Sequence, residues 1–272
     1  MTFTTGDNNW GQPGKWYVHP TAGLGTHTTI AAALASASSK DTIYLAAGFT
    51  FTENLIISIP VQIAALGVST SNSATNTIIL GLITINSGGS QSSFTNIAFA
   101  VNSGNNITSS AATFITFTNC DFSNPGPSAY INNTSNGTWF FSYCNFEGSA
   151  AGPLFTLSGN AILDFQYCWA RGFSGGSSTI SSGSILFRFC ELSCLITTSS
   201  TATITIENCV VDNIGNHVFL THGGTGTSFI TNSYISSGSA AAISIGTGAT
   251  LTVSNLIINS TNANPITGLG TL

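Results

Sequence analysis

The sequence predicts an all-β solenoid with about 22–24 residues in each coil. Three observations predict it: a six-residue block that recurs eight times, an apolar pattern within each block, and a very low content of charged residues. The blocks run from FTNIAF at 94–99 to VSNLII at 253–258. A repeat of this length, held over so many copies, indicates stacked coils that bury their apolar faces against one another.

The fourth residue of each block sets the register of the coils. Apolar residues dominate three positions before it and two positions after it, whereas the position two before it is mainly polar. A single straight strand would alternate strictly, so the slip in alternation indicates two short strands that meet at a corner. The fourth residues are Ile97, Cys120, Cys144, Cys168, Cys190, Cys209, Ser233 and Leu256. Stacked coils would place such equivalent residues in inward columns, where a column is the set of residues at one position in successive coils.

The expected corner lies one residue before the fourth position. Asparagine, which tolerates the left-handed backbone of a tight bend, holds it in five coils. These residues are Asn96, Asn119, Asn208, Asn232 and Asn255. Tyr143, Tyr167 and Phe189 hold it in the other three, and we expect a different bend there because aromatic residues accept this conformation less readily. A further apolar run follows each block, which gives about three short strands per coil.

The N-terminal region differs from the repeats. Residues 1–25 are rich in Gly and Pro, and we expect an irregular arm that is either a lid on the first coil or a docking element for other virion or filament proteins. Residues 26–272 are expected to form the solenoid. A helix is expected at about 28–39, capped by Thr28 or Thr29. It would cover the first coil, whose backbone groups would otherwise lack partners.

Two stretches carry a resemblance to a known superfamily. The segment DTIYLAAGFTFTENLIISIPVQIAALG at 41–67, with TTIAAALASASSKD before it, resembles the opening of pectin-lyase-like chains. The preceding KWYVHPTAGLGTHTTI looks like the entry to the β-helix in phage tail-fibre proteins. The resemblance covers residues 26–272 and implies a single-stranded right-handed parallel β-helix with a short N-terminal capping helix. The superfamily includes polysaccharide lyases, hydrolases and esterases as well as phage tail spikes, so the resemblance specifies fold better than function.

Composition limits the partners. The chain has four basic and nine acidic residues among 272, for a net charge of −5, which argues against a nucleic-acid surface. No apolar run approaches the ~20 residues of a membrane span, so membrane insertion is not expected. The start, MTFTTGDNNW, lacks the basic and apolar regions of a signal peptide. We therefore expect a virion or extracellular surface location that is reached without a classical signal peptide.

Six cysteines raise the question of disulfide bonds. Five of them share the inward column at the fourth position, so we interpret these five as small buried apolar residues and expect a fold without disulfides. Cys194 lies outside the column, and its state is left open.

Catalytic residues are hard to find in the sequence. The β-helix enzymes of the resembled superfamily use carboxylates and basic residues on the first strand of the coil, but the expected first strands here (AYIN, LFTL, LITT, VFLT and AISI) have neither. Asp121 and Glu147 are close to one coil apart, without a further acid or base. His222 in THGG is interpreted as a turn residue, and the four histidines lack metal-ligand spacing. We therefore expect no catalytic residue, no metal site, no cofactor and no enzymatic activity.

Arg188 and Glu207 share one outward column on successive coils and are expected to form an exposed ion pair. The same register turns several large apolar residues outward. Three explanations remain open for them: association along the side of the solenoid, an aromatic platform for sugar rings, or cover by long turns. The residues that form this candidate association or glycan surface are Phe140, Tyr143, Tyr167, Trp169, Leu186, Phe189, Phe229 and Tyr234.

The favoured functional hypothesis is a non-enzymatic structural or adhesive protein, a phage tail-fibre or virion component that binds a host surface glycan or other virion proteins. The expected assembly is a homo-oligomer, with a trimer favoured. One alternative is a polysaccharide depolymerase, a lyase or hydrolase with a site between subunits. Another is a subunit of a cellular surface filament that stacks end to end.

Overall fold

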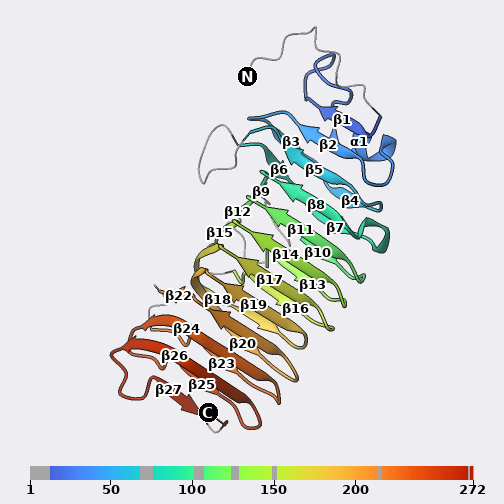
Figure 1. Ribbon diagram of the computed structural model, residues 1–272. Helices are drawn as coiled ribbons and strands as arrows, with labels where there is room; N and C mark the ends of the chain where they lie inside the picture. Colours follow the sequence, from blue (N-terminus) through green and yellow to red (C-terminus); the bar gives the residue numbers. More distant parts are fainter. Residues whose placement is uncertain are drawn as a thin grey trace.

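The computed structural model describes residues 13–67, 76–100, 107–123, 129–148, 152–212, 216–268 and 270–271. These residues form a right-handed parallel β-helix, which confirms the predicted fold class (Figure 1). Every strand pairing is parallel, and each coil pairs with the coil before it and the coil after it. The strands divide into three sheets, numbered here by the order of the strands within a repeat.

The strands stack in register from one coil to the next, so each sheet runs along the length of the β-helix. Sheet 1 consists of β4 (Leu55–Ile57), β7 (Ile83–Ile85), β10 (Ile107–Ser109), β13 (Ile131–Asn133), β16 (Phe155–Leu157), the ends of β18 (Trp169–Ile180) and β20 (Glu191–Thr198), β23 (Leu220–His222), β25 (Ile243–Ile245) and β27 (Ile266–Gly268). Sheet 2 consists of β1 (Lys15–Val18), β2 (Thr42–Leu45), β5 (Gln62–Ala65), β8 (Ser92–Thr95), β11 (Phe114–Thr118), β14 (Thr138–Ser142), β17 (Ile162–Gln166), β19 (Ser184–Arg188), β21 (Thr203–Glu207) and the starts of β24 (Thr227–Ser237) and β26 (Thr250–Ser260). Sheet 3 consists of β3 (Thr50–Thr52), β6 (Ile78–Leu80), β9 (Ala98–Ala100), β12 (Asp121–Ser123), β15 (Asn145–Glu147), the starts of β18 and β20, β22 (Val210–Val211) and the ends of β24 and β26.

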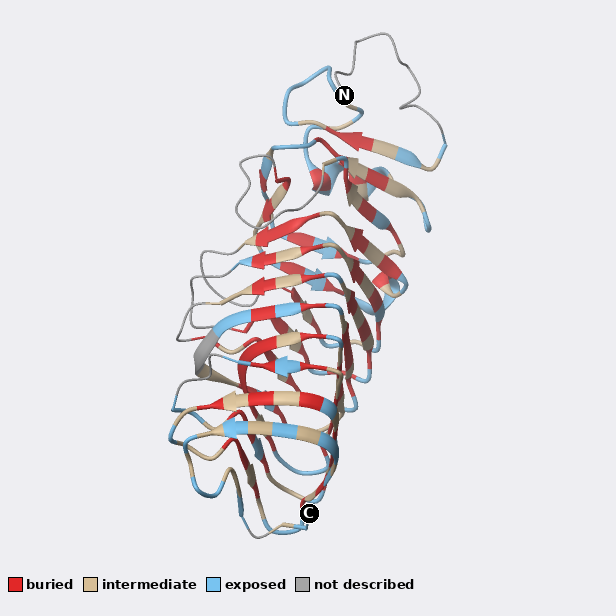
Figure 2. Cartoon of the chain, turned by 60° about the vertical axis from the view of Figure 1, so that its left-hand side comes forward, coloured by how far each residue is buried: buried red, intermediate tan, exposed pale blue. Residues whose placement is uncertain are grey.

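The core consists of the inward columns that the sequence predicts (Figure 2). Phe117 and Phe141 stack with ring centroids 4.8 Å apart and an interplanar angle of 4°, and similar stacks join Phe94 and Phe165 to the column. The five predicted cysteines are buried along one interior line, where each thiol lies within hydrogen-bond distance of a carbonyl oxygen of the preceding coil, as between Cys144 Sγ and Phe117 O at 3.6 Å.

All six cysteines, Cys194 included, are free thiols in the structure. Burial raises the pKa of Cys194 to about 12 and that of Cys144 well above its ordinary value. Both groups are therefore neutral at physiological pH and behave as small apolar core residues.

Helix α1 (Ile30–Ser36) is shorter than the helix expected at 28–39. Thr29 is its N-cap, and the helix stops because Ala37 is extended. The carboxylate of Glu53 accepts hydrogen bonds from the amides of Ile30 and Ala31, both at 2.9 Å, so two amides that lack partners within the helix are satisfied. A short 3₁₀ helix spans Ser87–Gly89, and within the described ranges no helix is long and apolar enough to cross a membrane.

The N-terminal arm contains one strand that sequence analysis did not predict. Strand β1 pairs in parallel with β2, with Lys15 opposite Thr42 and Val18 opposite Leu45. Trp16 Nε1 also donates a hydrogen bond to the Asp41 carboxylate at 2.8 Å. The described part of the arm therefore extends sheet 2, whereas residues 1–12, including Trp10, lie outside the described residues.

The corner between sheets 2 and 3 has one backbone conformation in every coil. The φ angle is 54° at Tyr143 and Tyr167 and 55° at Phe189, compared with 54° at Asn208 and 60° at Asn96. The expectation of a different bend at the aromatic residues is therefore wrong. The cause is cross-coil hydrogen bonding, because the amides of Tyr143, Tyr167 and Phe189 donate to the coil that follows, as Tyr143 does to Gln166 O at 3.0 Å.

Two side-chain expectations are also corrected. Arg188 forms its ion pair with Asp164, not with Glu207. The Asp164 side chain is only 6% exposed, so this pair is better shielded from water than an Arg188–Glu207 pair on the surface would be. His222 is buried on β23 rather than placed in a turn, with Nδ1 2.6 Å from Thr198 Oγ1 and Nε2 3.0 Å from the Gly226 carbonyl oxygen.

Candidate functional site

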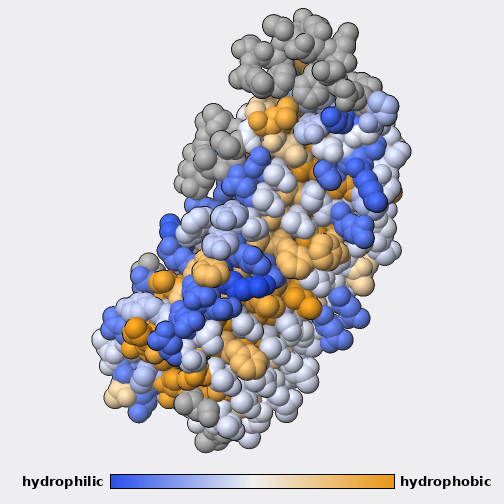
Figure 3. Space-filling view, viewed as in Figure 1, coloured by the Kyte–Doolittle hydropathy of each residue, from blue (hydrophilic) through white to orange (hydrophobic). Residues whose placement is uncertain are grey.

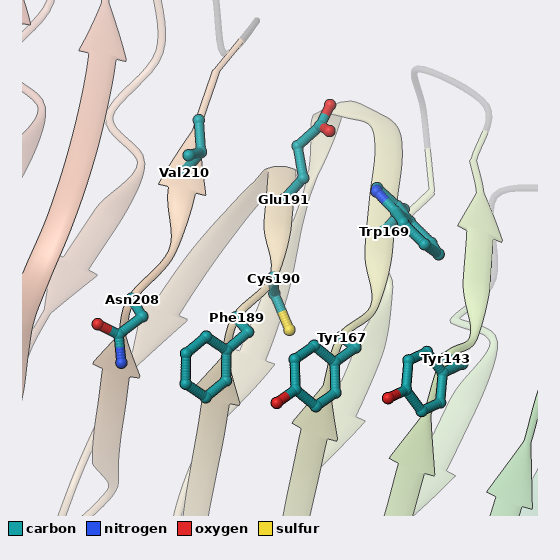
Figure 4. A pocket seen from close by; sticks show the side chains of 8 residues that line it. All are labelled: Tyr143, Tyr167, Trp169, Phe189, Cys190, Glu191, Asn208 and Val210. Carbon is teal, nitrogen blue, oxygen red and sulfur yellow. The ribbon is translucent and has the colours of Figure 1, made fainter.

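The candidate site is centred on three aromatic residues at the corner between sheets 2 and 3. We call Tyr143, Tyr167 and Phe189 the aromatic column. Adjacent ring centroids are 5.1 Å apart, and the interplanar angles are only 8° and 11°. The three residues are 54%, 41% and 50% exposed. Figure 4 shows the rings side by side at the outer edge of the coils, which makes a continuous aromatic strip along the β-helix.

The aromatic column occupies a backbone conformation that suits asparagine better. A left-handed conformation costs an ordinary L-residue about 1–2 kcal/mol, whereas Asn visits it routinely. Asn holds five of the eight corners, and in two places the neighbouring amides are hydrogen-bonded to each other, as Asn119 Nδ2 is to Asn96 Oδ1 at 2.8 Å. Three consecutive coils therefore carry exposed rings at positions where the fold favours a small polar residue.

A groove of about 510 Å³ runs beside the aromatic column (Figure 4). Trp169, Glu191 and Val210 form its second wall, and they stand opposite one another on neighbouring strands of sheet 3. The buried Cys190 and the corner residue Asn208 complete the lining. The site thus combines the aromatic column and the indole of Trp169 with one carboxylate, that of Glu191. A largely apolar surface with a few polar groups is typical of ligand-binding sites.

Charged side chains gather on the outer face of sheet 3 next to the groove. Arg171 and Glu191 form an exposed ion pair, with Nη2 and Oε2 3.0 Å apart. Glu147 stands opposite Arg171 in the parallel register, and its Oε1 accepts a hydrogen bond from Asn145 Nδ2 at 3.2 Å. Asp121 is on the neighbouring strand, two residues before the partner of Glu147, as the spacing in the sequence suggested.

The structure separates the predicted surface residues into two groups. Tyr143, Tyr167, Trp169 and Phe189 meet in the groove. The others do not line the groove: Phe140, Leu186 and Phe229 are on the outer face of sheet 2, and Tyr234 stands next to Val210 on the following strand of sheet 3.

On sheet 2, Phe140 packs on Phe114 with centroids 5.1 Å apart, but Asp164 separates it from Leu186 in the register. Tyr234 Oη accepts a hydrogen bond from Asn259 Nδ2 at 3.1 Å. Hydrophobic groups on this face of the molecule are divided by hydrophilic residues (Figure 3). The outward residues of sheet 2 therefore do not form a single apolar surface in the described structure.

Two polar residues of the site were missed by sequence analysis, Glu191 and Arg171. A signal for Glu191 was present, because it follows Phe189 by two residues just as Trp169 follows Tyr167. Arg171 comes two residues after Trp169 on the same strand, so its side chain points to the same outward face of the sheet. Among the described residues, no three His, Cys, Asp or Glu side chains are grouped so that they could hold a metal ion.

Comparison with known proteins gives a distant structural likeness. No protein-family model matches the chain, and no curated protein matches it. A solved structure of similar fold is a variant of the catalytic domain of a GH87 α-1,3-glucanase in complex with nigerose, with 12% sequence identity and a TM-score of 0.46. The match covers 90% of this chain but only 66% of that domain. At this identity the likeness concerns the fold.

The same finding corrects one prediction. Sequence analysis predicted that the chain is not an enzyme, yet the structure of similar fold is a catalytic domain of a glycoside hydrolase. The prediction of no enzymatic activity is therefore contradicted.

Proposed function

We propose that the aromatic column binds a polysaccharide. The observation that carries the proposal is the run of three exposed aromatic rings in left-handed backbone positions, where the other coils have asparagine. Unfavourable conformations of this kind persist where the side chain serves a function. The exposed rings stack on one another along the β-helix, so their outer edges form an apolar strip against which the C–H groups of sugar rings can pack.

The dimensions of the site support an extended glycan chain along the β-helix axis. The ring spacing of 5.1 Å is similar to the length of one sugar residue in such a chain, so each coil would hold one residue. Polar side chains flank the strip on both sides, with Gln166 and Arg188 on sheet 2 and Glu191 on sheet 3. These groups can hydrogen-bond sugar hydroxyls while the rings supply most of the contact area.

The experiment compares matched tyrosine variants in binding assays with a panel of neutral and acidic polysaccharides. Tyr167→Asn keeps the corner chemistry of the other coils but removes the central ring, whereas Tyr44→Asn removes a half-buried tyrosine on β2, far from the groove. Affinity electrophoresis should show retardation of the wild type and of Tyr44→Asn, and loss of retardation for Tyr167→Asn. Equal retardation of both variants would exclude the aromatic column as the binding site.

A second candidate function is cleavage of the bound glycan. Glu191 lines the groove beside Trp169, and Glu147 is on the same face two strands away, with Arg171 between them. Glycoside hydrolases use two carboxylates, ~5 Å apart in retaining enzymes and ~6.5–9.5 Å apart in inverting ones. The backbones of these two strands are about 10 Å apart over two coils, which is nearer to the inverting separation than to the retaining one.

Release of reducing ends tests the second candidate directly. Glu191→Gln and Glu147→Gln should each abolish the release, because a glutamine cannot transfer the proton. Glu207→Gln, on sheet 2, should leave the release unchanged. If wild-type protein binds a polysaccharide of the panel but releases no reducing ends from it, the proposal of cleavage fails while that of binding stands.

The biological setting remains a prediction from the sequence. We propose a trimeric virion or tail-fibre component, displayed at an outer surface, because the entry segment resembles those of tail-fibre chains. Sedimentation equilibrium would give the mass of the assembly, and a monomer at micromolar concentration would exclude the trimer.

A further inference from the structure

The outer face of sheet 1 carries a column of hydroxyl residues that the proposed function does not use. Nine successive coils contribute one residue each, and seven of these residues are threonine. In parallel register the column reads Thr84, Thr108, Asn132, Thr156, Thr179, Thr197, Thr221, Ser244 and Thr267. We call this set the hydroxyl column; all its members are exposed or half-buried.

A second polar column runs beside the first, two residues further along each coil. Its members are Asn86, Ser110, Thr134, Ser158, Ser181 and Ser199, each exposed or half-buried. Successive coils lie ~4.8 Å apart, and residues two apart in a strand lie ~6.8 Å apart. The two columns therefore make a planar lattice of polar groups with two fixed repeats.

The residue types of this lattice are not explained by strand propensity alone. Threonine favours strands, but it makes up only 38 of the 272 residues. The matching outward positions of sheet 2 hold Phe140, Asp164, Leu186 and Thr205 on successive strands, although they experience a similar backbone environment. From β7 onward the outward residues of sheet 1 are therefore polar and nearly uniform, whereas Ile56 on β4 is apolar and those of sheet 2 are mixed.

The hydroxyl groups are held in place but are not used within the protein. Threonine is β-branched and stiff about χ1, so its hydroxyl and methyl groups repeat in the same orientation from coil to coil. Within the described residues, Thr197 alone in this column has a side-chain hydrogen bond, to Ser177 Oγ at 2.6 Å. The hydroxyl column thus presents mostly unpaired hydroxyl groups to whatever it meets, whereas Asn86, Thr134 and Ser181 of the second column are hydrogen-bonded within the protein.

We propose that this face binds ice. The distance between coils (~4.8 Å) and the distance between the two columns (~6.8 Å) are similar to spacings between oxygen atoms in planes of the ice lattice. Many weak contacts can therefore form at once without movement of the backbone. No charged side chain, which would hold its own hydration shell, belongs to either column. A flexible ligand would not need a match in two dimensions over six coils, whereas a crystal surface does.

The test compares two lysine variants of the full-length protein with the wild type. Thr156→Lys places a charge at the centre of the hydroxyl column, and Thr205→Lys places the same charge on the half-buried outer face of sheet 2. Thermal hysteresis and uptake of fluorescently labelled protein into a growing ice hemisphere should be present for the wild type. Both should be lost in Thr156→Lys and kept in Thr205→Lys.

A milder variant covers the case in which Thr156→Lys fails to fold. Thr156→Val keeps the shape and the strand propensity but removes one hydroxyl, and it should reduce the hysteresis of the folded protein. Absence of ice uptake by the wild type would overturn the proposal, as would equal loss in Thr205→Lys. If Thr156→Lys instead abolishes binding to a crystalline polysaccharide while ice uptake is absent, the face belongs to that polysaccharide and not to ice.

Discussion

Phe189→Asn separates the structural role of the aromatic column from its proposed role in binding. Phe189 stacks on Tyr167 on one side and precedes the Asn208 corner on the other. The variant would give this corner the residue that the fold uses in most coils. We therefore expect a small change in the free energy of unfolding and a clear loss of polysaccharide affinity.

The expected change in stability follows from three terms. Loss of the stacked pair with Tyr167 removes about 0.5–1.5 kcal/mol. Relief of the left-handed conformation at residue 189 returns about 1–2 kcal/mol. A new amide hydrogen bond to Asn208, like that from Asn255 Nδ2 to Asn232 Oδ1 at 3.0 Å, adds about 0.5–1.5 kcal/mol. The variant should therefore be as stable as the wild type or slightly more stable.

Phe189→Ala is the matched control. It loses the same stacking contact but keeps an unfavourable conformation and gains no hydrogen bond, so it should be less stable than Phe189→Asn by about 1.5–3.5 kcal/mol. In calorimetric titrations with the polysaccharide that the wild type binds, both variants should lose about 1 kcal/mol, a roughly fivefold weaker affinity. Urea unfolding followed by circular dichroism measures the stability of each protein.

Two results would contradict this argument. If Phe189→Asn costs about 3–5 kcal/mol, as truncation of a buried phenylalanine does, the ring serves the fold and its exposure is incidental. If the affinity of a bound polysaccharide is the same in the wild type and in both variants, the ring contributes nothing to the binding.

Three further predictions concern other parts of the β-helix. Burial lowers the pKa of His222, so the stability that its neutral form contributes is present above the unfolded pKa of ~6.5 and is lost as pH falls. The urea midpoint should therefore fall with acidification, and less so in His222→Gln. Arg188→Met leaves the shielded Asp164 carboxylate without its cation and should cost ~3–5 kcal/mol by urea unfolding, whereas replacement of both residues by apolar ones should cost less. Glu53→Ala removes both hydrogen bonds to the start of α1 and should cost ~1–2 kcal/mol, with faster hydrogen exchange of those two amides.

The interior of this fold could be predicted from sequence because it depends on periodicity. Phe117 and Phe141 are 24 residues apart, and they lie on top of each other because each coil repeats the last. Cysteines such as Cys120 and Cys144 fall on the same interior line for the same reason. In a parallel solenoid the register of one coil fixes the register of the next. A periodic pattern in the sequence therefore predicts which residues stack on one another in the structure.

Features that depend on side-chain reach or on contacts between coils could not be predicted in the same way. The partner of Arg188 is a diagonal neighbour, Asp164, whose carboxylate is shielded next to Phe140 and Leu186 in the register. Sequence spacing gives the straight neighbour, Glu207, and says nothing about shielding. The bend at Tyr167 is imposed by its amide hydrogen bond to Arg188 O at 3.1 Å, which overrides the preference of an aromatic residue.

The proposed functional surfaces lie on outward columns, and the fold itself explains why. Backbone pairing between coils and the inward columns maintain the stacking, so many outward positions can change without loss of the fold. An outward column whose residue types the fold does not require therefore indicates a role beyond folding.

The aromatic column is one case, because it has Tyr143, Tyr167 and Phe189 at positions where asparagine would be less strained. The hydroxyl column is the other, because it is nearly uniform over nine coils, although any strand-forming residue would serve the sheet. Because one column lies at the corner between sheets 2 and 3 and the other on sheet 1, substitutions such as Tyr167→Asn and Thr156→Lys act at separate places, and each leaves the function of the other surface measurable.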